Sequence, residues 1–569
     1  MRCNRKKIST LIGSVMTISA LLASGSALAT ENGASSDLDW HVLDGVTVNS
    51  TASLCSNSTV KVCNGGILNT LYAKNNFMPY WLNLALVNAI MPQLQALADS
   101  NTLPGMKQRL KELKKLEALP DERGFDLLLT DTYLVYVDYV HQLMLDPRPL
   151  YNSQPVKLTP LTLKMAQSYF PLTVQKIHSL IPSSLFVPTM DVINRLLNLP
   201  ANPLDSSNVH FDEIVPFGDT ILYGGKVATV LWNLGYLTQP QYQQITAQAT
   251  ITNTGVMNQA IKAFQGDYGL KMDGIIGPDV VSQLIRPYSS LARITALNLQ
   301  RERFSQLQGN GPQIIVNIPD FKMTLYDNKK PVFESKIIDG MPKRPTNLFQ
   351  SYINTVVINP YWYVPETIKV KNIIPAAKAN PNFLKNSRID VINSWTDRSV
   401  VPPESIDWAT VDPQTFTHEF RQDTGPENAL GRVAFLMPDS FSVYLHDEAQ
   451  SEYPLFKHYH RDFSSGCMRV QKPRQLATMI LSYQNMPNLP SVDDMINTNK
   501  HREIGLNMRV NLDVAYLTAW VTPSGQLEMR HDIYGYDNSR AQPIQNQFIS
   551  IPNYRTKQRI KLALNDQTS

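Results

Sequence analysis

The period of the hydrophobic pattern changes once along this chain, near residue 311, and this change constrains the fold most strongly. Before it, apolar residues recur at spacings of three and four, as in residues 82–97 and 125–143, which is typical of amphipathic helices. After it they alternate, as in residues 314–318 and 322–326, which predicts strands. We therefore expect an α+β multidomain protein in which a helical region precedes a mainly β region.

The chain has 569 residues, enough for three or four domains of about 100–200 residues each. An irregular stretch within the β region suggests an inserted subdomain, and an insertion beside an active cleft can act as a lid. From these patterns we assign a helical scaffold domain to residues 30–219, a compact helical domain to 220–287, a helical linker to 288–310, a mainly β domain to 311–538 with its insertion at about 366–423, and a polar tail without an assigned role to 539–569.

Residues 1–29 have the features of a secretory signal. A basic start is followed by the apolar stretch Ile8 to Ala23 and by Ala27-Leu28-Ala29, an A-x-A cleavage pattern. We expect cleavage after Ala29 and export to the periplasm or cell envelope. An uncleaved membrane anchor is the alternative, but the apolar stretch is short for a span of about 20 residues.

The formal net charge of +4 comes from this segment. Its basic residues are Arg2, Arg5, Lys6 and Lys7, and it contains no acidic residue, so the mature chain is neutral. Nucleic-acid binding requires clustered positive charge, and nucleic acid is therefore not an expected partner.

Three cysteines remain after the signal: Cys55, Cys63 and Cys467. In an exported chain the close pair Cys55 and Cys63 can form a disulfide if the two residues approach closely enough. Cys467 then has no near partner in the sequence. A lone thiol outside the cytosol suggests a working cysteine.

The surroundings of Cys467 support a catalytic role. His446 ends an expected strand, and a neighbouring imidazole can take the proton of a thiol. Gly466 allows a close backbone turn before the cysteine, so that the amides of Gly466 and Cys467 can face an oxyanion. Arg469 would lie on the same face of a strand as Cys467, where it can receive a substrate carboxylate.

These residues resemble the motif of the L,D-transpeptidases with a YkuD-type catalytic domain: a strand-end histidine, a loop, and then Ser-x-Gly-Cys-x-Arg or Asn. Residues 464–469 of this chain read Ser-Ser-Gly-Cys-Met-Arg. Residues 425–431 are similar to the Gly-Pro-x-Asn-Ala-Leu-Gly segment of the family, and residues 359–365 resemble the segment before the lid in its larger, YcbB-like members. One residue departs from the pattern, because Ser465 stands where many members have histidine.

A second resemblance covers residues 234–278. The segments Leu-Gly-Tyr-Leu, Phe-Gln and Asp-Gly-Ile-Ile-Gly-Pro are similar to those of peptidoglycan-binding domains with a three-helix fold. The Asp273-Gly274 and Gly277-Pro278 pairs fit tight turns before a helix that starts near a proline. The resemblance implies wall binding, and the alternative is that these residues only determine the fold.

The first resemblance implies a reaction on peptidoglycan stem peptides, as both donor and acceptor, with no cofactor and no metal. Cys467 would be the nucleophile and His446 the general base, oriented by a main-chain carbonyl. Gly466, Ser465, Arg469 and Tyr444 would form the oxyanion and substrate site. The implied product is a cross-link between two third-position residues, and carbapenem-type inhibitors are expected to acylate Cys467.

Other readings stay open. An L,D-carboxypeptidase or an enzyme that anchors proteins to the wall would use the same motif, and a peptidoglycan-binding scaffold with an inert cysteine would need no chemistry at all. His458 and His460 have the spacing of a metal pair but lack accompanying ligands, and Ser464 lacks the Gly-x-Ser-x-Gly elbow of a serine nucleophile.

Overall fold

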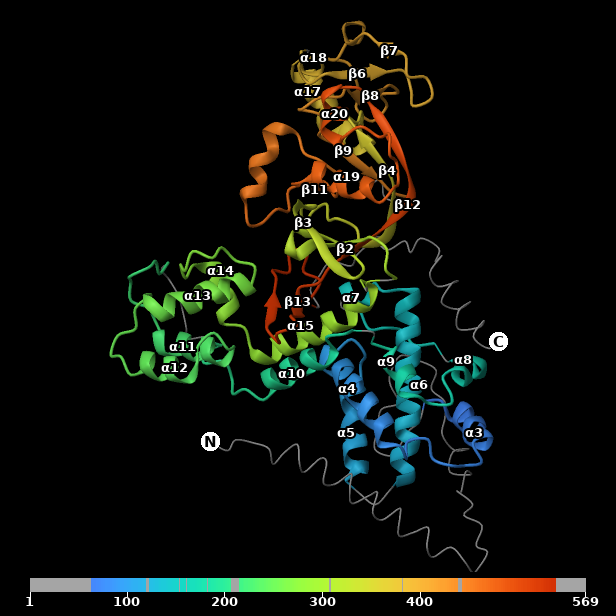
Figure 1. The fold of residues 1–569 in the computed structure, drawn as a ribbon, viewed down its shortest axis with the longest axis vertical. Coiled ribbons are helices and arrows are strands. Elements are labelled where there is room, and N and C mark those ends of the chain that lie inside the picture. Colours follow the sequence, from blue (N-terminus) through green and yellow to red (C-terminus); the bar gives the residue numbers. More distant parts are fainter. Residues whose placement is uncertain are drawn as a thin grey trace, which may run out of the picture. The chain divides into compact units, whose positions relative to one another are not determined.

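The computed structural model describes residues 63–538, except 119–121, 153, 160, 182, 206–213, 306, 308, 381 and 439–442. The expected signal segment, Cys55 and the tail from residue 539 lie outside the described residues, so the expected cleavage site and disulfide do too. The chain divides into two compact units (Figure 1): residues 1–145 with 155–182, and residues 146–154 with 183–569.

The first unit is helical. Asn83 caps the N-terminus of its second helix by accepting the Ala85 amide at 2.9 Å. Asp131, a buried carboxylate on the longest helix of this unit, connects neighbouring segments. It pairs with Arg109 at 2.8 Å and accepts the Cys63 amide at 2.9 Å. The helices are α3 (Gly65–Lys74), α4 (Leu84–Ser100), α5 (Met106–Glu117), α6 (Glu122–Leu145), α8 (Leu163–Ser168) and α9 (Val174–His178).

The helical scaffold assigned to residues 30–219 is divided between the two units. The short helix α7 (Pro149–Asn152) and α10 (Phe186–Leu197) belong to the second unit, where α10 packs on α15 (Tyr288–Arg301). Most residues of α15 are buried. The stretch assigned to a linker is therefore helical as expected, but it is a core helix of the second unit, because its apolar residues pack against α10 and β13 (Ala519–Val521).

The small helical domain of the second unit comprises α11 (Gly224–Asn233), α12 (Gln239–Thr246), α13 (Gly255–Asp267) and α14 (Pro278–Leu284). Three of these helices were expected. The sequence analysis missed α12, although its N-terminus has a capping box in which Thr238 and Gln241 each bond to the backbone of the other. Gly274 has φ +75°, and a Cβ there would be 2.3 Å from the Asn258 side chain, so this turn requires glycine.

The catalytic region is a closed barrel with the strand order β1-β12-β4-β9-β10-β11-β3-β2. Two of its pairs are parallel, β1 with β12 and β10 with β11, and the others are antiparallel. Alternate residues fill the interior with apolar side chains. The strands are β1 (Gln313–Asn317), β2 (Lys322–Asp327), β3 (Lys330–Ile338), β4 (Phe349–Ile358), β9 (Val433–Leu436), β10 (Leu445–His446), β11 (Met468–Val470) and β12 (Arg502–Ala515).

Two helices and a hairpin complete this region. The helices α19 (Pro473–Ser482) and α20 (Val492–Asn497) pack against β9 and β4, respectively. The hairpin joins β13 to β14 (Leu527–Met529). Residues 514 and 515, which precede the hairpin, belong to β12.

The insertion is a subdomain with its own core. Its four-stranded sheet has the order β5-β8-β6-β7 and packs against α17 (Ile374–Ala379), with Val391, Phe420 and Ile374 fully buried between them. Figure 1 shows β6, β7 and β8 grouped with α17 and α18 (Phe383–Asn386). The remaining elements are β5 (Trp362–Tyr363), α16 (Glu366–Ile368), β6 (Ile389–Ile392), β7 (Val400–Val401) and β8 (Glu419–Gln422). Whether this subdomain acts as a lid stays a prediction.

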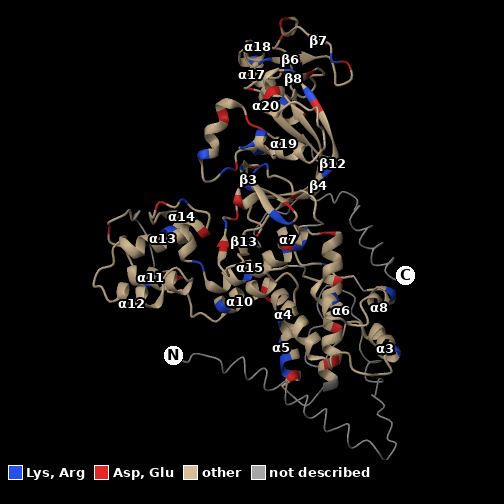
Figure 2. Ribbon diagram, in the orientation of Figure 1, with Lys and Arg blue, Asp and Glu red and all other residues tan. Residues whose placement is uncertain are grey.

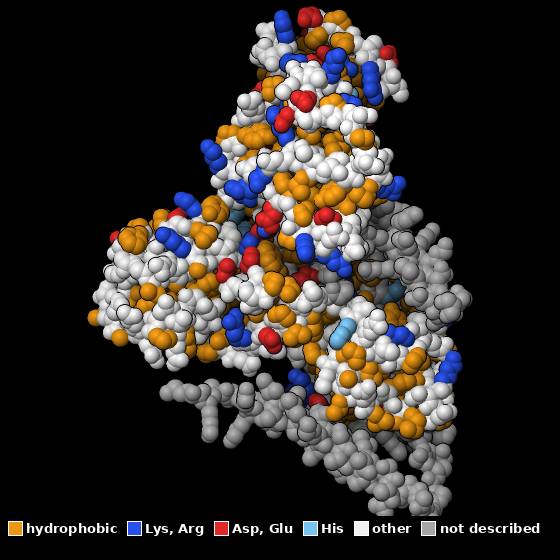
Figure 3. Space-filling model, viewed as in Figure 1, with side chains coloured by type: hydrophobic (Ala, Val, Ile, Leu, Met, Phe, Trp, Pro, Cys, Tyr) orange, Lys and Arg blue, Asp and Glu red, His pale blue; other side chains and the backbone are white. Residues whose placement is uncertain are grey.

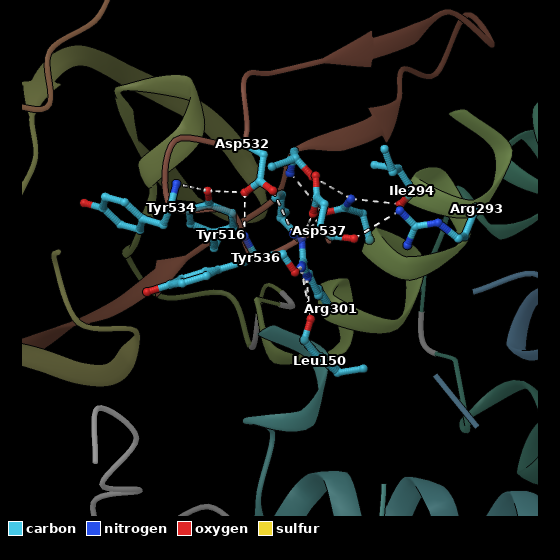
Figure 4. A network of polar contacts seen from close by, with 12 residues as sticks. Leu150, Arg293, Ile294, Arg301, Tyr516, Asp532, Tyr534, Tyr536 and Asp537 are labelled. Atoms are coloured by element: carbon cyan, nitrogen blue, oxygen red, sulfur yellow. Dashed lines mark hydrogen bonds and ion pairs between the residues drawn. The ribbon is translucent and has the colours of Figure 1, made fainter. Parts of the chain in front are cut away.

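A buried arginine ties the end of the catalytic region to α15 and α7 (Figure 4). The Arg301 guanidinium, with a side chain 0% exposed, donates to Asp537 Oδ1 at 2.6 Å, to the Tyr536 carbonyl at 2.8 Å and to the Leu150 carbonyl at 2.9 Å. Asp532 accepts from the Tyr516 hydroxyl at 2.6 Å. Burial, and then the charge of Asp537, raise the pKa of Asp532 to about 6.

Basic and acidic residues are interspersed along the ribbon (Figure 2). On the face drawn in Figure 3, hydrophobic side chains appear in small groups among polar and charged ones. Within the described ranges, no helix has both the length and the apolar character needed to cross a bilayer.

Candidate active site

The parallel pairing of β10 and β11 brings the sequence-predicted residues together. Leu445 lies opposite Met468 and His446 lies opposite Arg469, and the Met468 amide donates to the Tyr444 carbonyl at 3.0 Å. Because side chains alternate along a strand, His446 and Arg469 point to the same face of the paired strands, opposite to Leu445 and Met468. Tyr444 and Cys467 directly precede β10 and β11, and the bond from the Met468 amide to the Tyr444 carbonyl keeps these two strand ends side by side.

His446 is held as a neutral base. Its ring lies 4% exposed at the end of β10, and Nδ1 is 2.5 Å from the Asp447 carbonyl oxygen. A carbonyl only accepts, so Nδ1 carries the proton and Nε2 has the free lone pair. Burial, and then the Arg469 charge, lower the pKa of His446 to about 3. At neutral pH the ring is therefore unprotonated, so Nε2 is available to accept a proton, and a resting imidazolium partner for the thiol is disfavoured.

Arg469 is paired with a buried carboxylate. Its Nη1 donates to Glu448 Oε2 at 2.5 Å, and the Glu448 side chain is 3% exposed, against 24% for Arg469. Burial raises the pKa of Glu448, and Arg469 opposes that shift. Arg469 was expected to receive a substrate carboxylate, but in this structure its guanidinium already binds the carboxylate of Glu448.

A tight turn precedes Cys467. The Ser464 hydroxyl donates to the Cys467 carbonyl at 2.6 Å and accepts the Gly466 amide at 3.0 Å. Gly466 has φ +115°, a conformation that favours glycine. Its amide, expected to face an oxyanion, is thus bonded to Ser464 in this structure.

Two more contacts fix the turn against the end of β3. The Ser464 amide donates to the Asp339 carbonyl at 2.8 Å, and the Met341 amide donates to the Ser464 carbonyl at 3.0 Å. A Cβ on Gly340 would be 2.3 Å from the Arg344 carbonyl oxygen, so only glycine fits there. The Asp339 side chain is fully buried, and burial raises the pKa of its carboxyl.

Asp447 follows the candidate base, but its carboxylate is occupied by structural contacts. It accepts the Arg432 amide at 2.8 Å, the Glu448 amide at 2.7 Å and the Tyr453 hydroxyl. These bonds hold the segment around Gly431, where a Cβ would be 2.5 Å from the Asp447 carboxyl carbon. The side chain of Asp447 thus shapes the site, while its carbonyl orients His446.

The remaining predicted residues are placed separately. Ser465 is exposed, while Tyr444 and Cys467 are half-buried. His460 lies near Asp279, with 4.0 Å between Nε2 and Oδ2, and His458 packs edge-on against Phe463. Among the residues that the structure describes, no three His, Cys, Asp or Glu side chains form a group that could hold a metal ion.

Sequence reasoning missed two residues near the site. Glu448 was missed because its partner Arg469 is 21 residues away and only the strand register brings them together. Asn428 is 2% exposed and donates to the Pro360 carbonyl at 3.1 Å and to the Asp423 carbonyl at 2.9 Å. It therefore binds the chain at both ends of the insertion; its place in the Gly-Pro-x-Asn motif was the available signal.

Comparisons with family models divide the chain in a similar way. Residues 311–498 match the L,D-transpeptidase catalytic domain of the YkuD type. Residues 67–169 match a scaffold domain, and residues 227–284 match a putative peptidoglycan-binding domain. The sequence-based resemblance to a YkuD domain combined with a peptidoglycan-binding domain is confirmed; membership of the YcbB-like subgroup stays a prediction.

A curated relative described as a putative L,D-transpeptidase, from Haemophilus influenzae, is 33% identical over 249 residues, which cover 44% of this chain and 49% of that protein. This chain thus spans about half the length of the curated relative it matches. Among solved structures, L,D-transpeptidases from Xylanimonas cellulosilytica and Stackebrandtia nassauensis are 11% and 13% identical. Each aligns with 54% of this chain, covering 100% and 94% of its own chain, with TM-scores of 0.17 and 0.19. Scores this low carry no argument about the fold.

Proposed function

From the premise that residues 311–498 form an L,D-transpeptidase catalytic domain, we propose that this protein cross-links peptidoglycan stem peptides through a cysteine thioester. The donor is a tetrapeptide stem, and the bond formed joins the third residues of two stems. The observation that supports the proposal is the register of β10 and β11, which pairs His446 with Arg469, two residues after Cys467.

In the first half-reaction, the Cys467 sulfur attacks the carbonyl carbon of the third stem residue while His446 Nε2 takes the thiol proton. The carbon–nitrogen bond to the terminal D-alanine then breaks, and His446 returns the proton to the departing amine. The acyl group remains on sulfur as a thioester. The neutral tautomer set by the Asp447 carbonyl suits both transfers, because Nε2 can first accept and then donate.

In the second half-reaction, the side-chain amine of a third residue on a neighbouring stem attacks the thioester. His446 takes the proton that this amine loses and returns it to the departing Cys467 sulfur. The enzyme is regenerated, and no metal or organic cofactor takes part. The Glu448 carboxylate, paired with Arg469, offsets the positive charge beside this proton transfer.

The proposal also places the enzyme in the cell envelope, because the first 29 residues have the pattern of a cleaved signal. The putative peptidoglycan-binding domain supports a wall-associated substrate. Carbapenems, which offer a strained acyl group to a nucleophile, are expected to acylate Cys467.

Intact mass spectrometry of the mature protein with tetrapeptide-stem muropeptides tests the proposal. Wild type should gain an acyl adduct and produce cross-linked dimers, whereas Cys467→Ala should do neither. His446→Gln should lose about 100-fold or more in rate, the usual range for removal of a general base. The matched control is His458→Gln, an exposed histidine of the same region, which should retain activity.

The products also separate the alternatives. Release of D-alanine with tripeptide stems and no dimers identifies an L,D-carboxypeptidase. An adduct that is resolved only by protein amines identifies an anchoring enzyme. If no adduct forms while wall binding survives in Cys467→Ala, the protein is a binding scaffold.

A further inference from the structure

The segment that leads to the nucleophile touches the small helical domain. Tyr459, eight residues before Cys467, accepts the Met272 amide on its hydroxyl oxygen at 3.3 Å. The next residue, His460, has Nε2 4.0 Å from Asp279 Oδ2, in the first turn of α14. Met272 and Asp279 flank the turn that opens α14, so one edge of this domain meets two successive residues of the catalytic segment.

The next residue of this segment, Arg461, is buried and bonds to the barrel. The Arg461 guanidinium donates to the carbonyls of Ile337 at 3.0 Å, His458 at 2.7 Å and Phe321 at 2.9 Å. Arg461 is 7% exposed, so these bonds are largely shielded from water. They fix the position at which the segment leaves the small helical domain and turns towards the barrel.

Between Arg461 and Cys467 the segment is held by bonds at Arg461, Ser464 and Cys467. The Arg461 carbonyl accepts the Asp339 amide at 2.9 Å, and the Asp339 carbonyl accepts the Ser464 amide at 2.8 Å. The Ser464 hydroxyl then donates to the Cys467 carbonyl. A displacement of Tyr459 or His460 would therefore be passed along a short, bonded segment to the nucleophile.

A second contact fixes the same domain independently. Arg530, just after β14, donates to the Asp267 carbonyl at the end of α13 at 3.0 Å and forms an ion pair with Asp320 at 2.5 Å. Its stem lies against Gly269, where a Cβ would be 2.6 Å from Arg530 Cδ. Gln526 adds a bond to the Tyr236 hydroxyl at 3.2 Å. Because these contacts lie at separate places on the small helical domain, they restrict its rotation relative to the barrel.

We propose that the small helical domain is a positioning element of the catalytic centre, which braces Tyr459 and His460 and thereby holds the segment that presents Cys467. This inference rests on the proposed transpeptidase function. A domain that only tethers the enzyme to the wall raises the local substrate concentration and changes KM. A brace acts on the geometry of the reacting groups, and its loss lowers kcat.

The test compares Tyr459→Phe, Asp279→Asn and their combination with Asp219→Asn, a control at an exposed aspartate whose carbonyl accepts the Asn253 amide of the small helical domain. The combined variant removes the Tyr459 hydroxyl and the Asp279 charge beside His460, and it should lose about 3- to 10-fold in kcat with KM within about twofold. The control should match wild type. Arg530→Gln should reduce kcat as well; if it fails to fold, the Tyr459 and Asp279 variants still decide the question.

A second readout does not require transpeptidation. Alkylation of Cys467 by iodoacetamide, followed by peptide mapping, should change at least threefold in the combined variant and not in the control. Unchanged kcat and alkylation would overturn the brace, and so would a rise in KM alone. If alkylation changes while wild type cross-links no muropeptide, the brace stands and the proposed function fails.

Discussion

Arg469, which lies opposite the candidate base His446 on the neighbouring strand, donates to the buried carboxylate of Glu448 at 2.5 Å. Glu448→Gln removes the charge and keeps the shape, which leaves Arg469 without its anion and strengthens its unfavourable field at His446. We expect a loss of about 1–3 kcal/mol in stability and a lower kcat with little change in KM. Steady-state kinetics and thermal unfolding check this. Glu452→Gln, which changes an exposed acid nearby, is the control, and equal effects in the two variants would contradict the role given to the pair.

The low pKa of His446 predicts a pH dependence of stability. The unfolded histidine titrates near 6.5, whereas burial and Arg469 lower the folded pKa to about 3. Between these values the unfolded state binds more protons, so the free energy of unfolding falls as the pH is lowered from about 7 towards 3. His446→Gln cannot titrate, and its unfolding midpoint should fall less between pH 7 and pH 5. The same slope in wild type and variant would refute this assignment.

Asn428 predicts how the insertion is held. Its side-chain amide donates to the carbonyls of Pro360 and Asp423, so Asn428→Ala leaves acceptors at both ends of the insertion without that donor. We expect a cost of about 1–3 kcal/mol and faster protease cleavage within residues 366–423. Limited proteolysis with mass mapping measures this. Asn382→Ala, at an exposed position of the insertion, should cleave like wild type; unchanged cleavage in Asn428→Ala would disprove the role.

Arg301 predicts a purely structural effect. Its fully buried guanidinium binds Asp537 and the carbonyls of Tyr536 and Leu150. Arg301→Met leaves Asp537 buried without this partner, which should cost about 3–5 kcal/mol and lower the unfolding midpoint. Arg293→Met removes one bond, to the Asp537 carbonyl at 3.0 Å, and should cost about 1 kcal/mol. Comparable falls in the unfolding midpoint of the two variants would contradict the larger contribution assigned to Arg301.

The sequence predicted the elements whose patterns are local. Alternation between residues 314 and 326 marked β1 and β2, and helical spacing marked α4 and α6. It missed the first part of β12, although every second residue from Ile504 to Val514 is apolar and the residues between them, among them Asn507, Asn511 and Asp513, are polar or glycine. These polar residues are accommodated by tertiary contacts: Gln313, from the neighbouring strand, donates to Asp513, and the Gln484 carbonyl accepts the Asn507 amide at 3.1 Å.

The candidate active site likewise combines features that are visible in the sequence with features that depend on the fold. The motif around Cys467 and the strand-end position of His446 are visible in the sequence, and in the structure the register of β10 and β11 sets His446 opposite Arg469 of that motif. The contact between Asp447 and the His446 ring, the Glu448 and Arg469 pair and the Ser464 bond to Gly466 depend on register and on a turn. These features require coordinates, because a residue type alone does not say which of its groups a neighbour will bind.

The closure of the barrel has a consequence for the order of events during synthesis. Gln313 lies opposite Asn511, so β1, the first strand of the barrel, pairs with β12, the last. The strand β4 also pairs with β12. Until the ribosome has made residues near 515, both strands expose unpaired edges, which are prone to non-native association. Cys467 and His446 are synthesised earlier, but the barrel that carries them can close only after β12 has been made. A chain truncated before this strand should therefore be inactive and aggregation-prone, although its catalytic motif is complete.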